Sequence, residues 1–210
     1  PPDAIVLAES PGSSGAALRL LAELRPDVRI ICDVDDDGTP RAFLPIQGRK
    51  YARPVGSPMS DYHALITRVD SGVTYDSILR NTGIGAFHYA CAVDADRLRA
   101  PQILQRDETA ALEITTTAED WRAARDGSYR RHLKSTRRRI RKAEEDIGPR
   151  RVELFSRDID VYAALLRWKR EKFAQTGKYD VLSADWTQAL IRKLWERGQA
   201  ADLRCRILAL

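Results

Sequence analysis

The sequence VRIICDVDDDGTPRAFLPIQGRK, residues 28–50, decides the fold class of this 210-residue chain. It contains two runs with a β-strand pattern, 28–34 and 40–50, on either side of the turn Asp35-Asp36-Asp37-Gly38. This pattern predicts a β-hairpin, because Asp-Gly supplies the backbone conformations that a tight turn between strands needs. Since a sheet must bury at least one face, we expect further strands and helices on both sides of the hairpin.

Segments around the hairpin alternate between helix and strand patterns. Upstream, a turn cluster at 10–15 precedes an apolar-periodic helix over 16–24. Downstream, we expect a short helix over 75–80 and strands at 60–66, 86–93 and 111–117. Interleaved elements of this length predict an α/β or α+β domain that ends near residue 117.

Residues 118–210 carry mainly helical patterns. In 129–147 the apolar residues recur at spacings of 4, 3, 4, 3 and 4, which predicts one stripe along a helix that Gly148 ends. Two more helices, around 162–173 and over 184–197, alternate with strands at 151–155 and 202–210, and we expect Trp168 and Phe173 in the core. The final strand is apolar and has nothing behind it to pair with, so we expect the chain to be a fragment of a longer protein.

The positive charge is concentrated in one predicted helix. The chain has 35 Lys and Arg against 30 Asp and Glu, a net charge of +5. Residues 122–151 alone have a charge of +8, which leaves the rest of the chain at −3. The cations that surround the apolar stripe are Arg130, Arg131, Lys134, Arg137, Arg138, Arg139, Arg141 and Lys142. Such a helix attracts polyanions of any kind.

The composition disfavours membrane, disulfide-rich and metal-binding proteins. No run of 18 apolar residues and no secretory leader is visible, so we expect a soluble cytoplasmic protein. Three distant cysteines, Cys32, Cys91 and Cys205, are expected as buried thiols in a reducing compartment. The three histidines lack zinc spacing, and the aspartates of the hairpin turn match only half of a calcium loop, because Leu44 stands where the bidentate Glu belongs. We therefore predict no metal site.

Three motifs occur in an order that resembles a known family. The first is the strand with Leu44-Pro45, which leads through a Gly-Ser-Pro stretch to Ser60-Asp61-Tyr62. The second is the basic run from Tyr129 to Lys142, and the third is Arg167-Trp168-Lys169-Arg170 with the helix and strand that follow it. Together they cover about residues 28–210 and resemble the GNAT-superfamily acyltransferases of the CelD-like type, which are linked to bacterial cellulose and exopolysaccharide biosynthesis.

The resemblance implies a GNAT-like mixed, mostly antiparallel sheet flanked by helices. It also implies two such domains in tandem, a first over 1–117 and the N-terminal part of a second over 118–210. In this family an acyl group passes from acetyl-CoA or another acyl-CoA to an amine or hydroxyl, without a metal. The acceptor is expected to be a sugar, an amine or an envelope or exopolysaccharide precursor. Because the elements that hold the coenzyme A pyrophosphate would lie beyond Leu210, we expect the isolated fragment to be inactive.

The run Arg80-Asn81-Thr82-Gly83-Ile84-Gly85 has the R-x-x-G-x-G pattern that binds pyrophosphate in acetyl-CoA transferases. There the pattern follows a strand and opens a helix, whereas here a helix pattern precedes it and a strand pattern follows. We therefore interpret Gly83 as the residue after the helix C-cap. A cofactor site remains the alternative.

Two groups of residues are candidates for the site. Asp61 and Tyr62 are candidate catalytic residues, with Asp61 as general base or substrate contact; the alternative is an Asp that satisfies a turn. The candidate substrate-binding residues are Arg137, Arg138, Arg141 and Lys142, for coenzyme A phosphates or an anionic acceptor; a solvated surface and nucleic-acid binding are the alternatives. Two other functions stay open: a non-catalytic GNAT-like module that binds a polyanion or a partner, and a transferase of the same superfamily that uses aminoacyl-tRNA.

Overall fold

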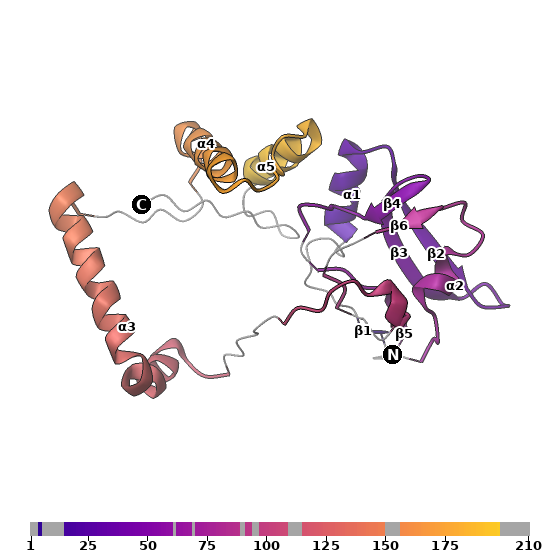
Figure 1. Ribbon diagram of the computed structural model, residues 1–210, viewed down its shortest axis with the longest axis horizontal. Coiled ribbons are helices and arrows are strands. Elements are labelled where there is room, and N and C mark those ends of the chain that lie inside the picture. The colour runs from indigo at the N-terminus through magenta and orange to yellow at the C-terminus, as the bar shows by residue number, and fades with distance from the viewer. Residues whose placement is uncertain are drawn as a thin grey trace. The chain divides into compact units, whose positions relative to one another are not determined.

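The structure, a computed structural model, describes residues 4–5, 15–60, 62–68, 70–88, 91–93, 97–108, 115–149 and 156–197. These residues form two compact units. The first unit contains the described residues up to 106 together with 156–197, and the second contains those from 107 to 149. Figure 1 shows the elements of both units.

The first unit contains a six-stranded, mostly antiparallel sheet. Its centre is the predicted hairpin, in which Ile31 of β2 lies opposite Leu44 of β3. β3 also pairs with β4 and β5 in the antiparallel sense, β5 pairs with β1, and β6 joins β4 in parallel. The strands are β1 (Ala4–Ile5), β2 (Val28–Val34), β3 (Pro40–Gly48), β4 (Tyr51–Pro54), β5 (Ile66–Arg68) and β6 (Ala86–Phe87). A mixed α/β fold with a mostly antiparallel sheet flanked by helices is thereby confirmed.

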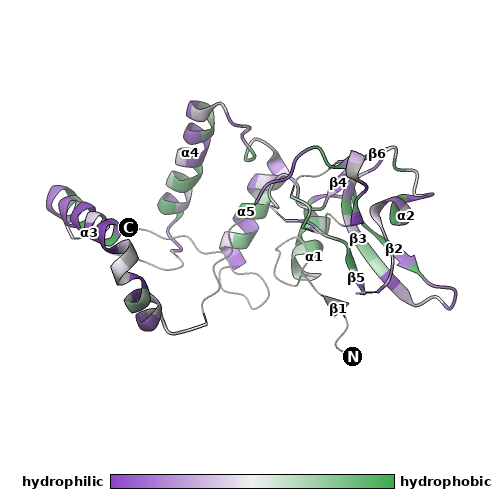
Figure 2. Ribbon diagram, turned by 60° about the horizontal axis from the view of Figure 1, so that its bottom comes forward, coloured by the Kyte–Doolittle hydropathy of each residue, from purple (hydrophilic) through white to green (hydrophobic). Residues whose placement is uncertain are grey.

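The two sides of the sheet are covered by different helices (Figure 1). Alternation along β3 directs Leu44 and Ile46 to one face, where α2 (Tyr75–Leu79) covers them with Tyr75 and Ile78. On the other side, Leu20 and Leu21 of α1 (Gly15–Leu24) form a second apolar cluster. α1 is largely hydrophobic, as its colour in Figure 2 shows. A short 3-10 helix, η2, spans Ala100–Gln102.

Two helices from the C-terminal part of the chain complete the first unit. α4 (Ile159–Thr176) contacts α5 (Asp185–Arg197) through the stacked rings of Tyr162 and Trp195, whose centres are 4.7 Å apart. α5 packs on α1, where Leu190 joins the cluster of Leu20 and Leu21. Segments at opposite ends of the sequence thus share one core.

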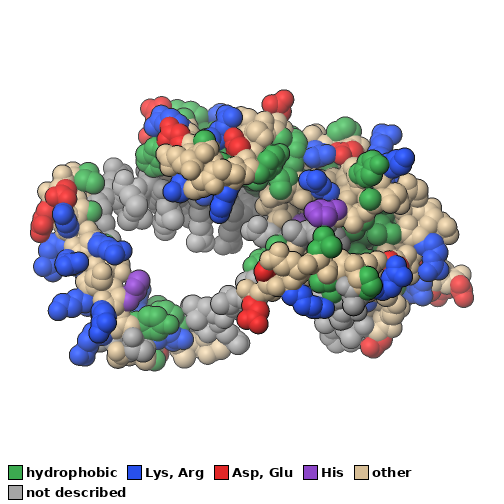
Figure 3. Space-filling view, in the orientation of Figure 1, with side chains coloured by type: hydrophobic (Ala, Val, Ile, Leu, Met, Phe, Trp, Pro, Cys, Tyr) green, Lys and Arg blue, Asp and Glu red, His purple; other side chains and the backbone are tan. Residues whose placement is uncertain are grey.

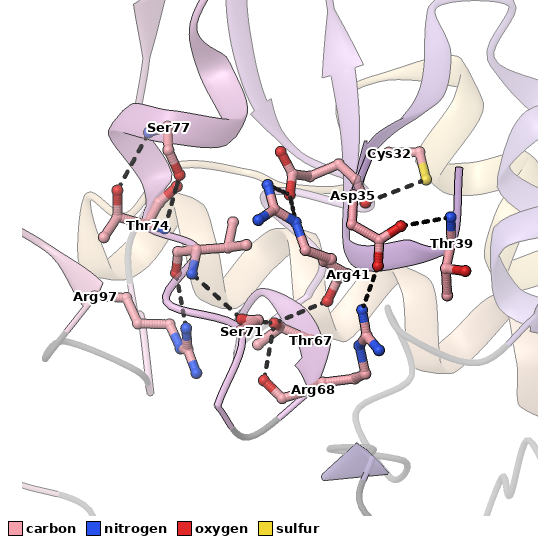
Figure 4. Close-up of polar contacts among 12 residues, drawn as sticks. Cys32, Asp35, Thr39, Arg41, Thr67, Arg68, Ser71, Thr74, Ser77 and Arg97 are labelled. Atoms are coloured by element: carbon pink, nitrogen blue, oxygen red, sulfur yellow. Dashed lines mark hydrogen bonds and ion pairs between the residues drawn. The ribbon is translucent and has the colours of Figure 1, made fainter. Parts of the chain in front are cut away.

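Charged side chains hold the turn of the hairpin (Figure 4). Asp35 accepts a hydrogen bond from the backbone N–H of Thr39 at 2.8 Å, and its other carboxylate oxygen lies 3.2 Å from Nη2 of Arg68 on β5. Hydrogen bonds with Asp35 and Thr39 lower the pKa of Asp37 to about 2. No group of three potential metal ligands occurs among the residues that the structure describes. Asp35 and Asp37 both accept from the N–H of Thr39, so the aspartates lie in the hairpin turn that the sequence predicts.

The second unit is built around α3 (Ala118–Ile147), which Gly148 ends as predicted. The helix begins well before the apolar stripe, because the hydroxyl of Thr117 accepts a hydrogen bond from the N–H of Asp120 and caps the first turn. α3 is strongly polar in Figure 2. Within the described part of the chain, no helix combines the length and the hydropathy that crossing a bilayer requires.

Some predicted elements are shorter than expected. The strand over 60–66 begins only at Ile66, preceded by a single bridge between His63 and Ala92. Among the described residues of the strand predicted over 86–93, only Ala86–Phe87 and that bridge are β-structure, and residues 89 and 90 lie outside the description. The strands at 151–155 and 202–210, most of the strand at 111–117, and Cys205 lie outside the described residues.

Three residues are exposed where the sequence predicts burial. Cys32 is exposed because its neighbour Ile31 packs against the core, so that alternation turns Cys32 to the open face. Cys91 is also exposed, in a loop where its φ is +60°. Trp168 on α4 is 64% exposed, and the expectation of a core residue there is wrong. The helical spacing of apolar residues shows that two residues share a helix face, but it does not show whether another element covers that face.

Candidate functional site

A cleft of about 370 Å³ opens in the first unit between two segments that are far apart in the sequence. One side comes from the end of β3, from β4 and from the turn after it, and includes Gln47, Tyr51 and Arg53. The other side comes from the α4–α5 loop and the first turn of α5, and includes Tyr179 and Trp186. Its volume lies in the range of small-molecule sites.

Gln47 organises the turn that carries Ser57 and Pro58 into the cleft. Its side chain is buried, with Oε1 accepting from the N–H of Gly56 at 2.8 Å and Nε2 donating to the carbonyl of Ser57 at 2.5 Å. Gly56 has φ +81°, and a Cβ added there would collide with Oγ of Ser60. One buried amide and one glycine therefore hold this turn in place.

Arg25 and Asp27 form a neutral pair in the wall of the cleft. Nε and Nη2 of Arg25 donate to the two carboxylate oxygens of Asp27 at 2.9 and 2.6 Å. The guanidinium carbon also lies 4.9 Å from the centre of the Trp186 ring, within the range of a cation–π contact. The hydrogen bond from Arg25 holds the pKa of Asp27 below its usual 3.8. Both charges are thus satisfied by each other.

Arg53 differs from Arg25, because its exposed guanidinium has no ion pair or hydrogen bond with any described residue. Two tyrosine side chains, Tyr51 and Tyr179, also line the cleft and are 75% and 68% exposed. The hydroxyl of Thr187 is already used, since it donates to the carbonyl of Ala184 at 2.7 Å. The cleft therefore offers one unpaired cation and two accessible aromatic rings to a ligand.

Of the two predicted catalytic residues, the structure describes only Tyr62. Asp61 lies outside the described residues. Tyr62 is 43% exposed and does not line the cleft. It precedes His63, whose N–H donates to the carbonyl of Cys91 at 3.1 Å, so Tyr62 stands next to the bridge between the 62–68 and 91–93 segments.

The four predicted substrate-binding residues lie together on α3. Arg137, Arg138, Arg141 and Lys142 are all exposed and have no partner among the described residues. At 3.6 residues per turn they span roughly 140° of the helix surface, on the side away from the apolar stripe. Figure 3 shows Lys and Arg side chains along much of this helix. We call these four residues the basic face; it belongs to the second unit, whereas Tyr62 belongs to the first.

The R-x-x-G-x-G segment has the order that the sequence predicts. α2 ends at Leu79 with Arg80 as its C-cap, and β6 follows at Ala86. The residue after the cap is Asn81, with φ +62°, so the prediction that Gly83 holds this position is wrong. The helix ends at Leu79, one residue before its predicted end, and Asn tolerates the left-handed conformation.

Sequence reasoning did not identify the cleft residues. Tyr51, Arg53 and Tyr179 belong to no motif. Tyr179 lies more than a hundred residues from the other two in the sequence. The one usable signal is Gln47, a polar residue in an otherwise apolar strand that leads to a Gly-Ser-Pro turn. A buried amide in such a place needs specific partners.

Residues 130–210 match the sequence model of a family described as an acetyltransferase (GNAT) domain. The matched segment includes most of α3, with the basic face, and all of α4 and α5. The mixed fold is consistent with this family. Neither the curated proteins nor the solved structures contain a match to the chain.

Proposed function

We propose that this protein is a GNAT-type acyltransferase that takes an acyl group from acetyl-CoA or another acyl-CoA. The match of residues 130–210 to a GNAT acetyltransferase domain carries the proposal. We propose that the acceptor is a sugar, an amine, or an envelope or exopolysaccharide precursor. It reacts through an amine or a hydroxyl group. The proposed tandem domains, 1–117 and 118–210, follow the CelD-like resemblance, and we propose a cytoplasmic location.

The donor supplies an acyl group activated as a thioester, and the acceptor nitrogen or oxygen displaces the coenzyme A thiol. The chain must then bind the donor phosphates and remove one proton from the acceptor. The basic face suits the first task, because four exposed cations without partners among the described residues match phosphate groups. Asp61 is the proposed base, with Tyr62 as a neighbouring hydrogen-bonding group.

A second candidate function is supported by the same helix. Four unpaired cations on one helix also suit a tRNA or another polyanion, through charge alone. In that case the protein is an aminoacyl-tRNA-dependent transferase of the superfamily, or a GNAT-like module that binds a polyanion or partner. Of the residues facing this side of α3, none offers an aromatic stacking platform beside the basic face, which favours the acyl-CoA proposal.

Calorimetric titration of acetyl-CoA into the full-length gene product distinguishes these functions. Dephospho- and desulfo-coenzyme A serve as controls for the phosphate and thiol contributions, and release of free thiol in the presence of candidate acceptors measures turnover. The acyltransferase proposal expects saturable binding that weakens with the dephospho analogue. Absence of acetyl-CoA binding, together with tRNA binding that weakens steeply with salt, overturns it in favour of the second candidate.

A further inference from the structure

The cleft in the first unit has a simple charge pattern. Its charged lining residues are Arg25, Asp27 and Arg53, and the first two neutralise each other through a two-pronged hydrogen bond. Arg53 remains as the one lining cation without a partner in the described structure. This pattern complements a single negative charge. A phosphate dianion would keep one charge uncompensated, and an ammonium group would be repelled.

The aromatic content of the cleft specifies what the negative charge is attached to. Tyr51 begins β4 and Tyr179 lies in the α4–α5 loop, so the two rings come from different segments. Both are mostly exposed, and an exposed aromatic ring offers a flat apolar face beside a hydroxyl that can donate or accept. A ligand that contains a ring can pack flat against the tyrosine rings and hydrogen-bond to their hydroxyls. A linear acid has no flat face to pack against either ring.

The walls between these groups are set before any ligand arrives. Gln47 holds the Ser57–Pro58 turn with two hydrogen bonds, and the Arg25–Asp27 pair packs on Trp186. Residues that already satisfy each other lose little freedom when a small molecule binds. The volume of about 370 Å³ accommodates a small molecule and not a macromolecular segment.

We propose that this cleft binds a small ring-bearing monocarboxylate. Arg53 binds the carboxylate, for which the planar guanidinium is suited, and the rings of Tyr51 and Tyr179 contact the ligand ring. The ring belongs either to a sugar acid or to an aromatic acid. The further statement that this ligand is the acyl acceptor and reacts through a hydroxyl rests on the proposed function. The binding of the ligand does not depend on that function.

Titrations of two acids and their neutral counterparts test the proposal. Methyl glucuronide is compared with methyl glucoside, and benzoate with benzamide, by calorimetry or by chemical-shift changes in the full-length protein without acetyl-CoA. We expect at least one acid to bind, and its neutral counterpart to bind at least about tenfold more weakly. Binding of the glucuronide alone identifies a sugar acid, and binding of benzoate alone identifies an aromatic acid.

Matched variants locate the binding. Arg53→Gln should weaken binding of the acid about tenfold. Arg106→Gln, which changes an exposed arginine outside the cleft, should leave the affinity unchanged. Tyr51→Ala and Tyr179→Ala should also weaken binding, and Tyr129→Ala on α3 should not. The positions changed are exposed, and thermal unfolding verifies that each variant folds.

Three results overturn the proposal: neither acid binds, the neutral counterpart binds equally well, or Arg53→Gln binds like the unchanged protein. These results are separate from those that test acyl transfer, because no acyl-CoA is present. Acid binding without acetyl-CoA turnover contradicts the proposed function and leaves the cleft assignment standing. Acetyl-CoA turnover without acid binding supports the proposed function and contradicts the cleft assignment.

Discussion

Nζ of Lys193 lies 2.8 Å from Oε2 of Glu23, although 170 positions separate the two residues in the sequence. This hydrogen bond lowers the pKa of Glu23 below its usual 4.5. It lies at the contact between α5 and α1, beside the apolar cluster of Leu20, Leu21 and Leu190. The contact also shapes the cleft, because α5 contributes one side of the cleft and the sheet near α1 contributes the other.

The apolar part of the α1–α5 contact should matter more for stability than the ion pair. Leu20 is fully buried, so Leu20→Ala should lower the free energy of unfolding by about 2–5 kcal/mol. Lys193→Ala should leave the urea midpoint nearly unchanged, because an exposed ion pair is screened by solvent. Equal loss in both variants would contradict this assignment.

Gln47→Ala should destabilise the first unit by about 1–3 kcal/mol, because it leaves the N–H of Gly56 and the carbonyl of Ser57 without their partners. Gln102→Ala is the control, since that side chain is exposed and should change the unfolding free energy much less. Urea denaturation measures both. A loss no larger than that of the control would show that Gln47 does not hold the turn.

Gly56→Ala should cost more than Gly72→Ala, although both glycines have positive φ. A Cβ at Gly72 meets nothing within 4 Å, so that variant has only the backbone penalty of about 1–2 kcal/mol. At Gly56 the Cβ also meets Oγ of Ser60. The double variant Gly56→Ala with Ser60→Ala should therefore recover part of the difference in unfolding free energy. No recovery would mean that the side chain of Ser60 is not the obstacle.

Arg25 should control the titration of Asp27. Because the folded pKa of Asp27 is below 3.8, the pair stabilises the fold above that pH, and this contribution is lost as the pH falls through the lower folded pKa. In Arg25→Gln the pKa of Asp27 should rise toward or above 3.8. NMR titration of the carboxyl carbon measures it in both proteins, and an unchanged pKa would exclude Arg25 as the cause.

The basic face should govern binding of polyanions. Changing Arg137, Arg138, Arg141 and Lys142 to Gln should weaken heparin or tRNA binding and reduce its salt dependence, because each lost phosphate contact removes about 0.7–0.9 from the slope of log K against log salt. The control changes Arg167, Lys169, Arg170 and Lys172 on α4, where both arginines form ion pairs with acids, and should have a smaller effect. Equal effects would mean that net charge, and not the basic face, drives binding.

The sequence was sufficient to predict those elements that depend on neighbouring residues in the chain. The hairpin of β2 and β3 follows from alternation around an Asp-Gly turn, and its turn is closed by hydrogen bonds between Asp35 and Thr39. α3 ends at Gly148 as predicted, because a glycine accepts the positive φ at its C-cap, here +112°. The basic face follows from helical spacing alone.

Burial and short-range details were less predictable. The sequence predicts a core position for Trp168 and a buried thiol for Cys32, yet both are exposed. A spacing shows which residues share a face of an element, but only packing decides whether that face is covered. In the same way, Asn81 instead of Gly83 follows the cap of α2, because the helix ends where the carbonyl of Leu79 accepts hydrogen bonds from both the N–H and the hydroxyl of Thr82.

The sequence by itself determined the mixed fold, the end of α3 at Gly148 and the concentration of cations on one helix, because each depends on neighbours within a few turns or along one hairpin. The cleft was decided only by the tertiary structure. Arg53 and Tyr179 become parts of one surface because α5 packs on α1 and brings the α4–α5 loop to the end of β3. That contact depends on the fit of apolar side chains from distant segments, which no local spacing encodes.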